Sequence, residues 1–210
     1  MLTVFLAAQV ALGDVPEGVR PVVVPIDAPS QYAAFLKSKG ESASPLACRT
    51  LWEGYSLLCF RVWERKVRRW VTVDDLEAWS VTVGDLETAV AVRAREMVST
   101  GVEAVAVDGM TSTYLRLTDG DGWAASGGLV PEGLTKRLGI PFLAAIPAEG
   151  VFVAWAHGDP ELDHVMAVGV RELYDEQPGG VSPFVHAWDG QKWLPFGEAK
   201  PSVATPGSPH

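Results

Sequence analysis

The chain has 210 residues, of which 48% are hydrophobic and 20% charged, so its composition is that of a globular protein and not of a disordered one. Its formal net charge of −9 argues against a general nucleic-acid-binding protein, because such proteins need Lys and Arg to neutralise phosphates. The apolar run at the start of the chain is too short to cross a bilayer, and no later stretch predicts a membrane span.

Residues 1–13 are apolar, and Ala11-Leu-Gly13 would suit signal peptidase. No Lys or Arg precedes this run, however, whereas a signal peptide needs a positively charged start. Two interpretations stay open: a signal peptide of a secreted or periplasmic protein, or the first core element of a cytoplasmic protein, which we favour. We expect residues 14–196 to form a single α+β domain and residues 197–210, rich in Pro, Ser, Gly and Ala, to form a disordered tail.

The first half of the domain predicts an extended segment around residues 22–24 and then a helix that begins with Ser30 as its N-cap and ends at Gly40. The strand at 55–63 has apolar residues on both faces for most of its length, which indicates a central strand. Three strands are expected in this region, at about 46–51, 55–63 and 67–71.

The two cysteines of the chain, Cys48 and Cys59, lie in the first two of these strands. If the strands form a hairpin around Glu53-Gly54, the thiols lie close together, and a disulfide then depends on the compartment. The alternative is a pair of small buried apolar side chains. The sequence contains no C-x-x-C motif and no Cys/His spacing typical of a zinc site.

Residues 61–69, RVWERKVRR, carry five bases against one acid. This local excess predicts either a patch that binds an acidic protein partner or a hairpin tip that faces water, which is the more common fate of a charge run. The bases of this candidate patch are Arg61, Arg65, Lys66, Arg68 and Arg69.

Two helix starts follow in quick succession. Thr72 precedes a helix at 73–79 and Thr82 precedes a helix at about 83–99, each with Asp three residues after the Thr, which is typical of a capping box. The longer helix carries an apolar stripe and ends at Gly101. The stripe consists of Leu86, Val90, Ala94 and Met97. Strands are expected at 103–108 and 113–118.

Residues 129–193 alternate helices and strands with clear start and stop signals. A short helix follows Pro131 and ends at Gly139, strands cover 142–147 and 151–156, and a helix covers 160–176. A last hairpin is expected from 184–188 and 191–196, with a type I′ turn on Asp189-Gly190. The whole pattern predicts an α+β fold, in which the helices pack on a mixed, mostly antiparallel sheet.

The same region contains the one crowd of metal-capable side chains. Its weak candidates for a metal or acid–base site are His157, Asp159, Asp163 and His164. We favour a helix start instead, with Asp159 as N-cap and Pro160 as first helical residue. Asp163 and His164 are adjacent, so they point about 100° apart and have no ligand partner one turn further on.

The chain lacks the motifs of nucleophilic enzymes and nucleotide-binding proteins: G-x-S-x-G, S-x-x-K, Walker A and G-x-G-x-x-G are all missing. His186 alternates with Phe184 and Trp188, and a lone His in such a strand is more often packed or solvent-facing than catalytic. We therefore assign no catalytic residue, no cofactor-binding residue and no cofactor.

From Trp70 onward the chain resembles the YtpQ-like family of uncharacterised bacterial proteins (domain of unknown function 1444). One stretch runs from Arg69 to Ala89 and contains both Thr-led helix starts; the other includes Ile146-Pro147, residues 151–155 and 183–193. Many members carry an Asn in the helix after the second cap, where this chain has Val90-Ala-Val-Arg93. The resemblance implies a compact mixed α/β domain and a cytoplasmic protein, and it implies no activity, substrate or catalytic residue.

From these observations we expect a non-enzymatic protein-interaction domain, such as an inhibitor, immunity or adaptor protein, with a protein partner and without nucleic acid. One alternative is a hydrolase-like enzyme that uses residues 157–164. Another is a secreted, envelope-associated protein held by Cys48 and Cys59.

Overall fold

The computed structural model describes residues 15–196 except 17, 65–66, 120–122 and 178. The expected N-terminal segment 1–13 and tail 197–210 lie outside the described residues, as do Arg65 and Lys66 of the candidate basic patch. None of the helices in the described part is both long enough and apolar enough to cross a membrane.

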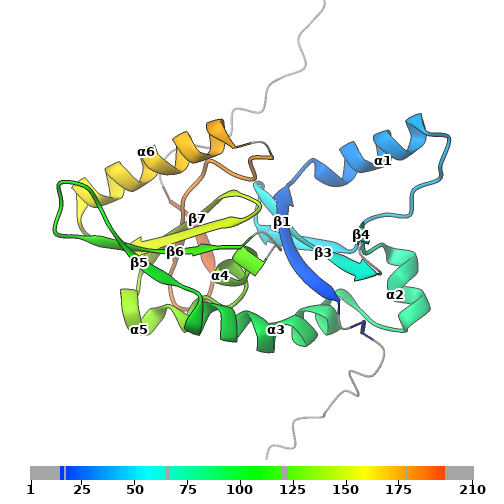
Figure 1. Cartoon of the computed structure of the whole chain (residues 1–210), viewed down its shortest axis with the longest axis horizontal. Coiled ribbons are helices and arrows are strands. Elements are labelled where there is room, and N and C mark those ends of the chain that lie inside the picture. Colours follow the sequence, from blue (N-terminus) through cyan, green and yellow to red (C-terminus); the bar gives the residue numbers. More distant parts are fainter. Residues whose placement is uncertain (1–14, 17, 65–66, 120–122, 178, 197–210) are drawn as a thin grey trace, which may run out of the picture.

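The described residues form two sheets with helices packed against them (Figure 1), which confirms the predicted α+β class. Every strand pair in the described part is antiparallel. The sequence predicted one sheet, whereas the strands before and after helix α3 (Val83–Thr100) belong to separate sheets.

The first sheet contains β1 (Val19–Pro25), β2 (Cys48–Trp52), β3 (Ser56–Glu64) and β4 (Val67–Trp70). Strand β3 pairs with β1 along one edge and with β2 and then β4 along the other, so it is the central strand that its apolar faces predicted. The β2–β3 hairpin turns at Gly54, which has a φ of 77° and therefore favours glycine.

The second sheet has six strands in the order β10-β9-β7-β8-β6-β5. Its outermost strands are β5 and β10. The strands are β5 (Glu103–Ala106), β6 (Thr113–Thr118), β7 (Phe142–Ala148), β8 (Val151–Ala156), β9 (His186–Trp188) and β10 (Trp193–Pro195).

Helices cover both faces of the sheets. In Figure 1, α3 and α5 (Thr135–Leu138) lie below them, while α6 (Pro160–Glu176) lies above the second sheet and α1 (Ala28–Ser38) above the first. The remaining helical segments are α2 (Val73–Trp79), α4 (Ser126–Leu129) and two short 3₁₀ turns, Trp123–Ala125 and Pro131–Gly133.

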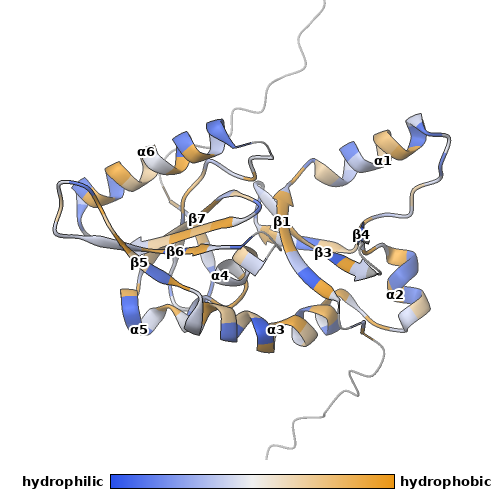
Figure 2. Ribbon diagram, in the orientation of Figure 1, coloured by the Kyte–Doolittle hydropathy of each residue, from blue (hydrophilic) through white to orange (hydrophobic). Residues whose placement is uncertain are grey.

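The largest apolar cluster lies between α3 and both sheets. Helix α3 contributes Leu86, Val90, Ala94 and Val98, so Val98 is the buried residue of its last turns, and the predicted Met97 is only partly buried. A second cluster fills the space between α6 and the second sheet. Figure 2 shows the same pattern: the strands are mostly hydrophobic, and the helices alternate hydrophobic and hydrophilic residues.

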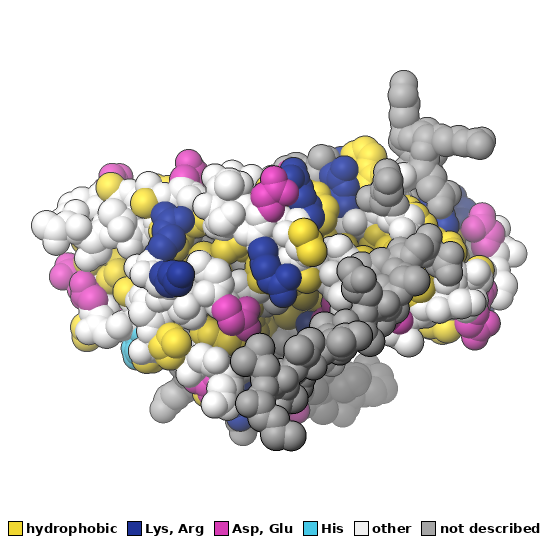
Figure 3. Space-filling view, turned by 90° about the horizontal axis from the view of Figure 1, so that it is seen from below, with side chains coloured by type: hydrophobic (Ala, Val, Ile, Leu, Met, Phe, Trp, Pro, Cys, Tyr) yellow, Lys and Arg dark blue, Asp and Glu magenta, His cyan; other side chains and the backbone are white. Residues whose placement is uncertain are grey.

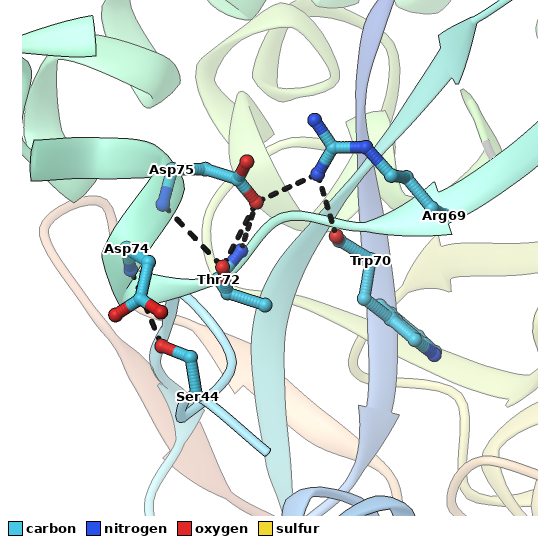
Figure 4. A network of polar contacts seen from close by, with 6 residues as sticks. All are labelled: Ser44, Arg69, Trp70, Thr72, Asp74 and Asp75. Carbon is cyan, nitrogen blue, oxygen red and sulfur yellow. Dashed lines mark hydrogen bonds and ion pairs between the residues drawn. The ribbon is translucent and has the colours of Figure 1, made fainter. Parts of the chain in front are cut away.

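Both Thr-led helix starts are confirmed. Thr72 accepts a hydrogen bond from the backbone N–H of Asp75, and the Asp75 carboxylate accepts one from the backbone N–H of Thr72 (Figure 4). Thr82 and Asp85 form the same reciprocal pair. These hydrogen bonds lower the pKa of Asp85 below its ordinary value. Asp can therefore replace the Glu or Gln of the usual capping box.

Two local predictions were wrong. Helix α1 begins one turn earlier than expected, with Asp27 as N-cap and Pro29 in the first turn, and Ser30 lies inside the helix. Strands β9 and β10 are joined by four residues and not by a two-residue type I′ turn. The carboxylate of Asp189 accepts hydrogen bonds from the N–H groups of Gln191 and Lys192, which holds this wider loop.

Candidate partner-binding surface

Strand register brings arginines and tryptophans together on the outer face of the first sheet. Arg20 of β1 lies opposite Arg61 of β3. Arg61 lies opposite Trp70 of β4, and Trp63 lies opposite Arg68. Because alternate residues of a strand share a face, these side chains form one surface. We call it the Arg/Trp face; it consists of Arg20, Arg61, Trp63, Arg68 and Trp70.

Each arginine of this face stacks on an indole ring. The guanidinium carbon of Arg68 lies 4.1 Å from the ring centroid of Trp63, and that of Arg20 lies 4.9 Å from the same ring. Arg61 lies 4.0 Å from the ring centroid of Trp70. Such stacking is favourable because the cation meets the negative face of the ring, and it holds the long side chains in fixed positions.

Arg61 also connects the two sheets. Its guanidinium forms an ion pair with Glu149, which lies in the turn between β7 and β8, 88 residues further along the chain. The charge of Arg61 is therefore partly balanced within the protein. This ion pair links the turn between β7 and β8 to the Arg/Trp face.

Arg69 points away from the Arg/Trp face and has a structural role. Its guanidinium donates hydrogen bonds to Asp75 at 2.7 Å and to the Trp70 carbonyl at 3.3 Å (Figure 4). Burial acts to raise the pKa of Asp75, but the hydrogen bonds from Arg69 and Thr72 outweigh it and lower this pKa below its ordinary value. Arg69 thus joins β4 to the start of α2, and its side chain does not belong to the predicted patch.

Of the predicted patch, the structure therefore brings Arg61 and Arg68 together and places Arg69 elsewhere. The structure adds Arg20, which is 41 residues before Arg61 in the chain. The sequence did not indicate that Arg20 belongs to this surface, because composition alone does not show that β1 pairs with β3. The alternation Arg61-x-Trp63 was the available signal for a stacked surface.

Helix α1 stands beside this face without a buried residue of its own. Tyr32 meets Trp70 edge-on, with ring centroids 6.4 Å apart, while Phe35 is 57% exposed. The helix thus contacts the Arg/Trp face through Tyr32 and exposes the aromatic side chain of Phe35 to solvent. By contrast, the face seen from below carries basic and acidic side chains interspersed with hydrophobic ones (Figure 3).

The Cys48–Cys59 disulfide lies on the same side of the first sheet. The two residues are directly opposite each other in β2 and β3, with Cα atoms 4.2 Å apart. They pack in a small cluster with Val22, Val24 and Trp70, so the disulfide supports β3, the strand that carries Arg61 and Trp63.

Three of the four weak candidates for a metal site have other interactions in the structure. Asp159 caps α6 by accepting hydrogen bonds from the N–H groups of Glu161 and Leu162. Asp163 accepts a hydrogen bond from the indole N–H of Trp155 at 2.9 Å, and its other oxygen lies 2.8 Å from Nδ1 of His157. His164 is exposed. Within the described residues no group of three His, Cys, Asp or Glu is placed to hold a metal ion.

His186 is buried between the two sheets. Only 1% of it is exposed, and its ring stacks on the indole of Trp52. Burial lowers the pKa of His186 to about 4, against a smaller opposing effect of the Phe184 backbone, so the ring is neutral near pH 7. Aromatic residues surround it, including Tyr55 at 5.2 Å between ring centroids. Of the two fates expected for this lone histidine, packed or solvent-facing, the structure shows the packed one.

No family model, no curated protein and no solved structure matches the chain in the three comparisons made.

Proposed function

We propose that the chain is a non-enzymatic protein-interaction domain, of the inhibitor, immunity or adaptor kind, and that its Arg/Trp face binds an acidic region of a partner protein. The observation that carries the proposal is the stacking of three arginines on two tryptophans on one sheet face. Trp, Tyr and Arg are the residues most enriched at energetically dominant positions of protein interfaces.

The chemistry of this surface suits carboxylates. A guanidinium binds a carboxylate in a bidentate manner through its planar fork of N–H groups. Because the arginines are already ordered by the rings, binding loses less side-chain entropy than it would for freely rotating side chains. Two copies of this face would repel each other through their arginines, which disfavours a symmetric dimer through it.

The test is retention of a partner by immobilised protein. The wild type is compared with Arg68→Glu, which reverses an exposed charge of the Arg/Trp face, and with Arg95→Glu, which reverses an exposed charge on α3. A partner retained by the wild type and by Arg95→Glu, but lost with Arg68→Glu, supports the proposal. Equal retention by all three proteins would rule out the Arg/Trp face as the contact.

The Cys48–Cys59 disulfide favours a secreted protein, since disulfides persist mainly in oxidising compartments. We propose an envelope-associated or periplasmic protein as the second candidate, in contrast to the cytoplasmic location that the family resemblance implies. Membership of the YtpQ-like family also remains a proposal. It rests on the Arg69–Ala89 run, whose Thr-led helix caps are structural features.

A further inference from the structure

An apolar groove of about 480 Å³ runs between α6 and the β5–β6–β8 part of the second sheet. Its floor is formed by side chains of the sheet face that points toward α6, and α6 forms one wall. Most of the lining side chains are hydrophobic; they include Val105, Tyr114, Val153, Met166 and Leu173.

The groove exists because α6 covers only part of the sheet. The helix packs chiefly on β7, near the middle of the six strands, so the β5 and β6 end of the same face has no helix above it in the described part of the chain. Along the open side of α6, Val165 and Val168 are 40% and 45% exposed. A helix with its apolar face toward the sheet would complete this layer.

Gly169 lies in the wall of the groove, in the middle of α6. A glycine in a helix interior costs about 1 kcal/mol relative to alanine. The fold does not require it here, because a Cβ at this position would meet no atom within 4 Å. Its effect is to leave the backbone of α6 open to close approach from within the groove.

Three acidic side chains of α6 lie within about one helical turn of residues that line the groove. Glu161, Glu172 and Glu176 are exposed and follow the same helical stripe as Val165 and Val168, since the five residues are spaced by three or four. This stripe contains no Lys or Arg. On the opposite wall, Arg116 is bound to Glu103, with a hydrogen bond of 2.7 Å that raises the pKa of Arg116. The rim along α6 is therefore negative.

We propose that this groove is a second docking surface, which takes a basic amphipathic helix of a partner protein. The apolar face of the helix would lie on the sheet beside α6, with its closest approach at Gly169, and its Lys or Arg side chains would meet the three glutamates. Helix-in-groove binding of this kind is a common mode of peptide recognition. With the Arg/Trp face on the first sheet, it gives the protein two surfaces of opposite charge preference, as an adaptor needs.

The probe is a synthetic leucine/lysine peptide of amphipathic helical pattern with the length of α6, 17 residues. Its affinity for the full chain is measured by fluorescence anisotropy at two salt concentrations. A peptide with Glu in place of Lys serves as the charge control. We expect the lysine peptide to bind and the glutamate peptide not to bind, because only the former complements the rim.

Gly169→Leu fills the groove without changing charge, and Ala167→Leu adds the same side chain on an exposed side of α6. The first should weaken binding by more than about tenfold and the second by less than about twofold. Leucine is a better helix former than glycine and close to alanine, so both variants should fold, which circular dichroism checks.

A second pair of variants tests the rim. Changing Glu161, Glu172 and Glu176 to Gln should weaken binding, while changing the exposed Glu41, Glu77 and Glu132 to Gln alters the net charge equally and should not. Undiminished binding to Gly169→Leu, or no binding to the wild type, would overturn the proposal. Binding that is lost with Val105→Pro but kept with Gly169→Leu would indicate a strand added to β5 and would also overturn the proposal. The same holds for a dimer of the free protein that Gly169→Leu dissociates.

Discussion

The imidazole of His186 and the indole of Trp52 lie parallel, with centroids 4.1 Å apart and planes inclined by 15°. The two residues belong to different sheets, β9 and β2, so the stack is part of the contact between the sheets. A neutral ring suits this position, because a charge there would be buried among apolar neighbours.

The pKa of His186 predicts a loss of stability in mild acid. The folded protein leaves His186 unprotonated down to about pH 4, whereas the unfolded chain binds a proton below about pH 6.5. The free energy of unfolding should therefore fall as the pH falls from 6.5 to 4, by about 3 kcal/mol in total. Urea unfolding of the wild type and of His186→Phe across this range measures the effect.

The His186→Phe variant should lose most of this pH dependence, and His164→Ala, a change of an exposed histidine, should keep it. The lowered pKa values of Asp75 and Asp85 act in another range. These two carboxylates stabilise the folded protein when the pH is above their ordinary pKa of 3.8. This stabilisation is lost only as the pH falls below that value. Identical slopes for wild type and His186→Phe between pH 6.5 and 4 would contradict this account of His186.

The hydrogen bond from the Trp155 indole N–H to Asp163 predicts that Asp163, a weak candidate for a metal ligand, has a structural role. Asp163→Ala removes the acceptor of the buried indole N–H, which should lower the free energy of unfolding by about 1–3 kcal/mol. Asp175→Ala changes an exposed acid of the same helix and should stay within about 0.5 kcal/mol of wild type. Equal urea midpoints for the two variants would show that the Trp155 bond adds nothing.

The Cys48–Cys59 disulfide closes a loop with a sequence separation of 11. Replacing both cysteines by alanine should lower the free energy of unfolding by about 2–4 kcal/mol, because the unfolded chain gains conformational freedom. A reductant should lower the free energy of unfolding of the wild type to nearly that of the double variant. It should not change the free energy of unfolding of the double variant. Mass measurement with and without reductant checks the bond directly, and a wild type insensitive to reductant in both measurements would contradict it.

Two helical glycines should respond oppositely to alanine. A Cβ on Gly127 would lie 2.4 Å from the ring of the buried Phe152, so Gly127→Ala should destabilise the protein by about 1–3 kcal/mol. A Cβ on Gly169 meets no atom within 4 Å, and Gly169→Ala should stabilise by up to about 1 kcal/mol. Thermal unfolding of the two variants compares them, and a destabilised Gly169→Ala would show that the fold needs this glycine.

Local signals predicted much of the fold. Helix α6 has the predicted bounds because Asp159 and Pro160 start it and the Pro178-Gly-Gly180 segment follows its end. Both capping boxes were visible as Thr-x-x-Asp. The start of α1 was missed because Ser30 was taken as the N-cap, whereas Pro29 fits the first turn of a helix and Asp27 occupies the N-cap position.

The surfaces depend on contacts that local patterns do not encode. Arg61 meets Glu149, and Arg20 meets Trp63, only because strands far apart in the chain lie side by side. The sequence also left His157 and Asp163 as weak candidates for metal ligands, and only the structure shows that the Asp163 carboxylate binds the indole N–H of Trp155. The division into two sheets is also a result of tertiary packing. From the sequence alone, the strands before and after α3 could equally have belonged to one sheet.

The apolar cluster beneath the two sheets takes residues from both of them, with Trp52 and Phe60 on one side and Phe142 and Phe152 on the other. Each half of the chain therefore needs the other to bury this shared cluster. We expect the described part to unfold in a single cooperative transition, and a cut in the loop after β5 to yield fragments that are stable only when they associate. The two binding surfaces proposed above are thus carried by one cooperative unit.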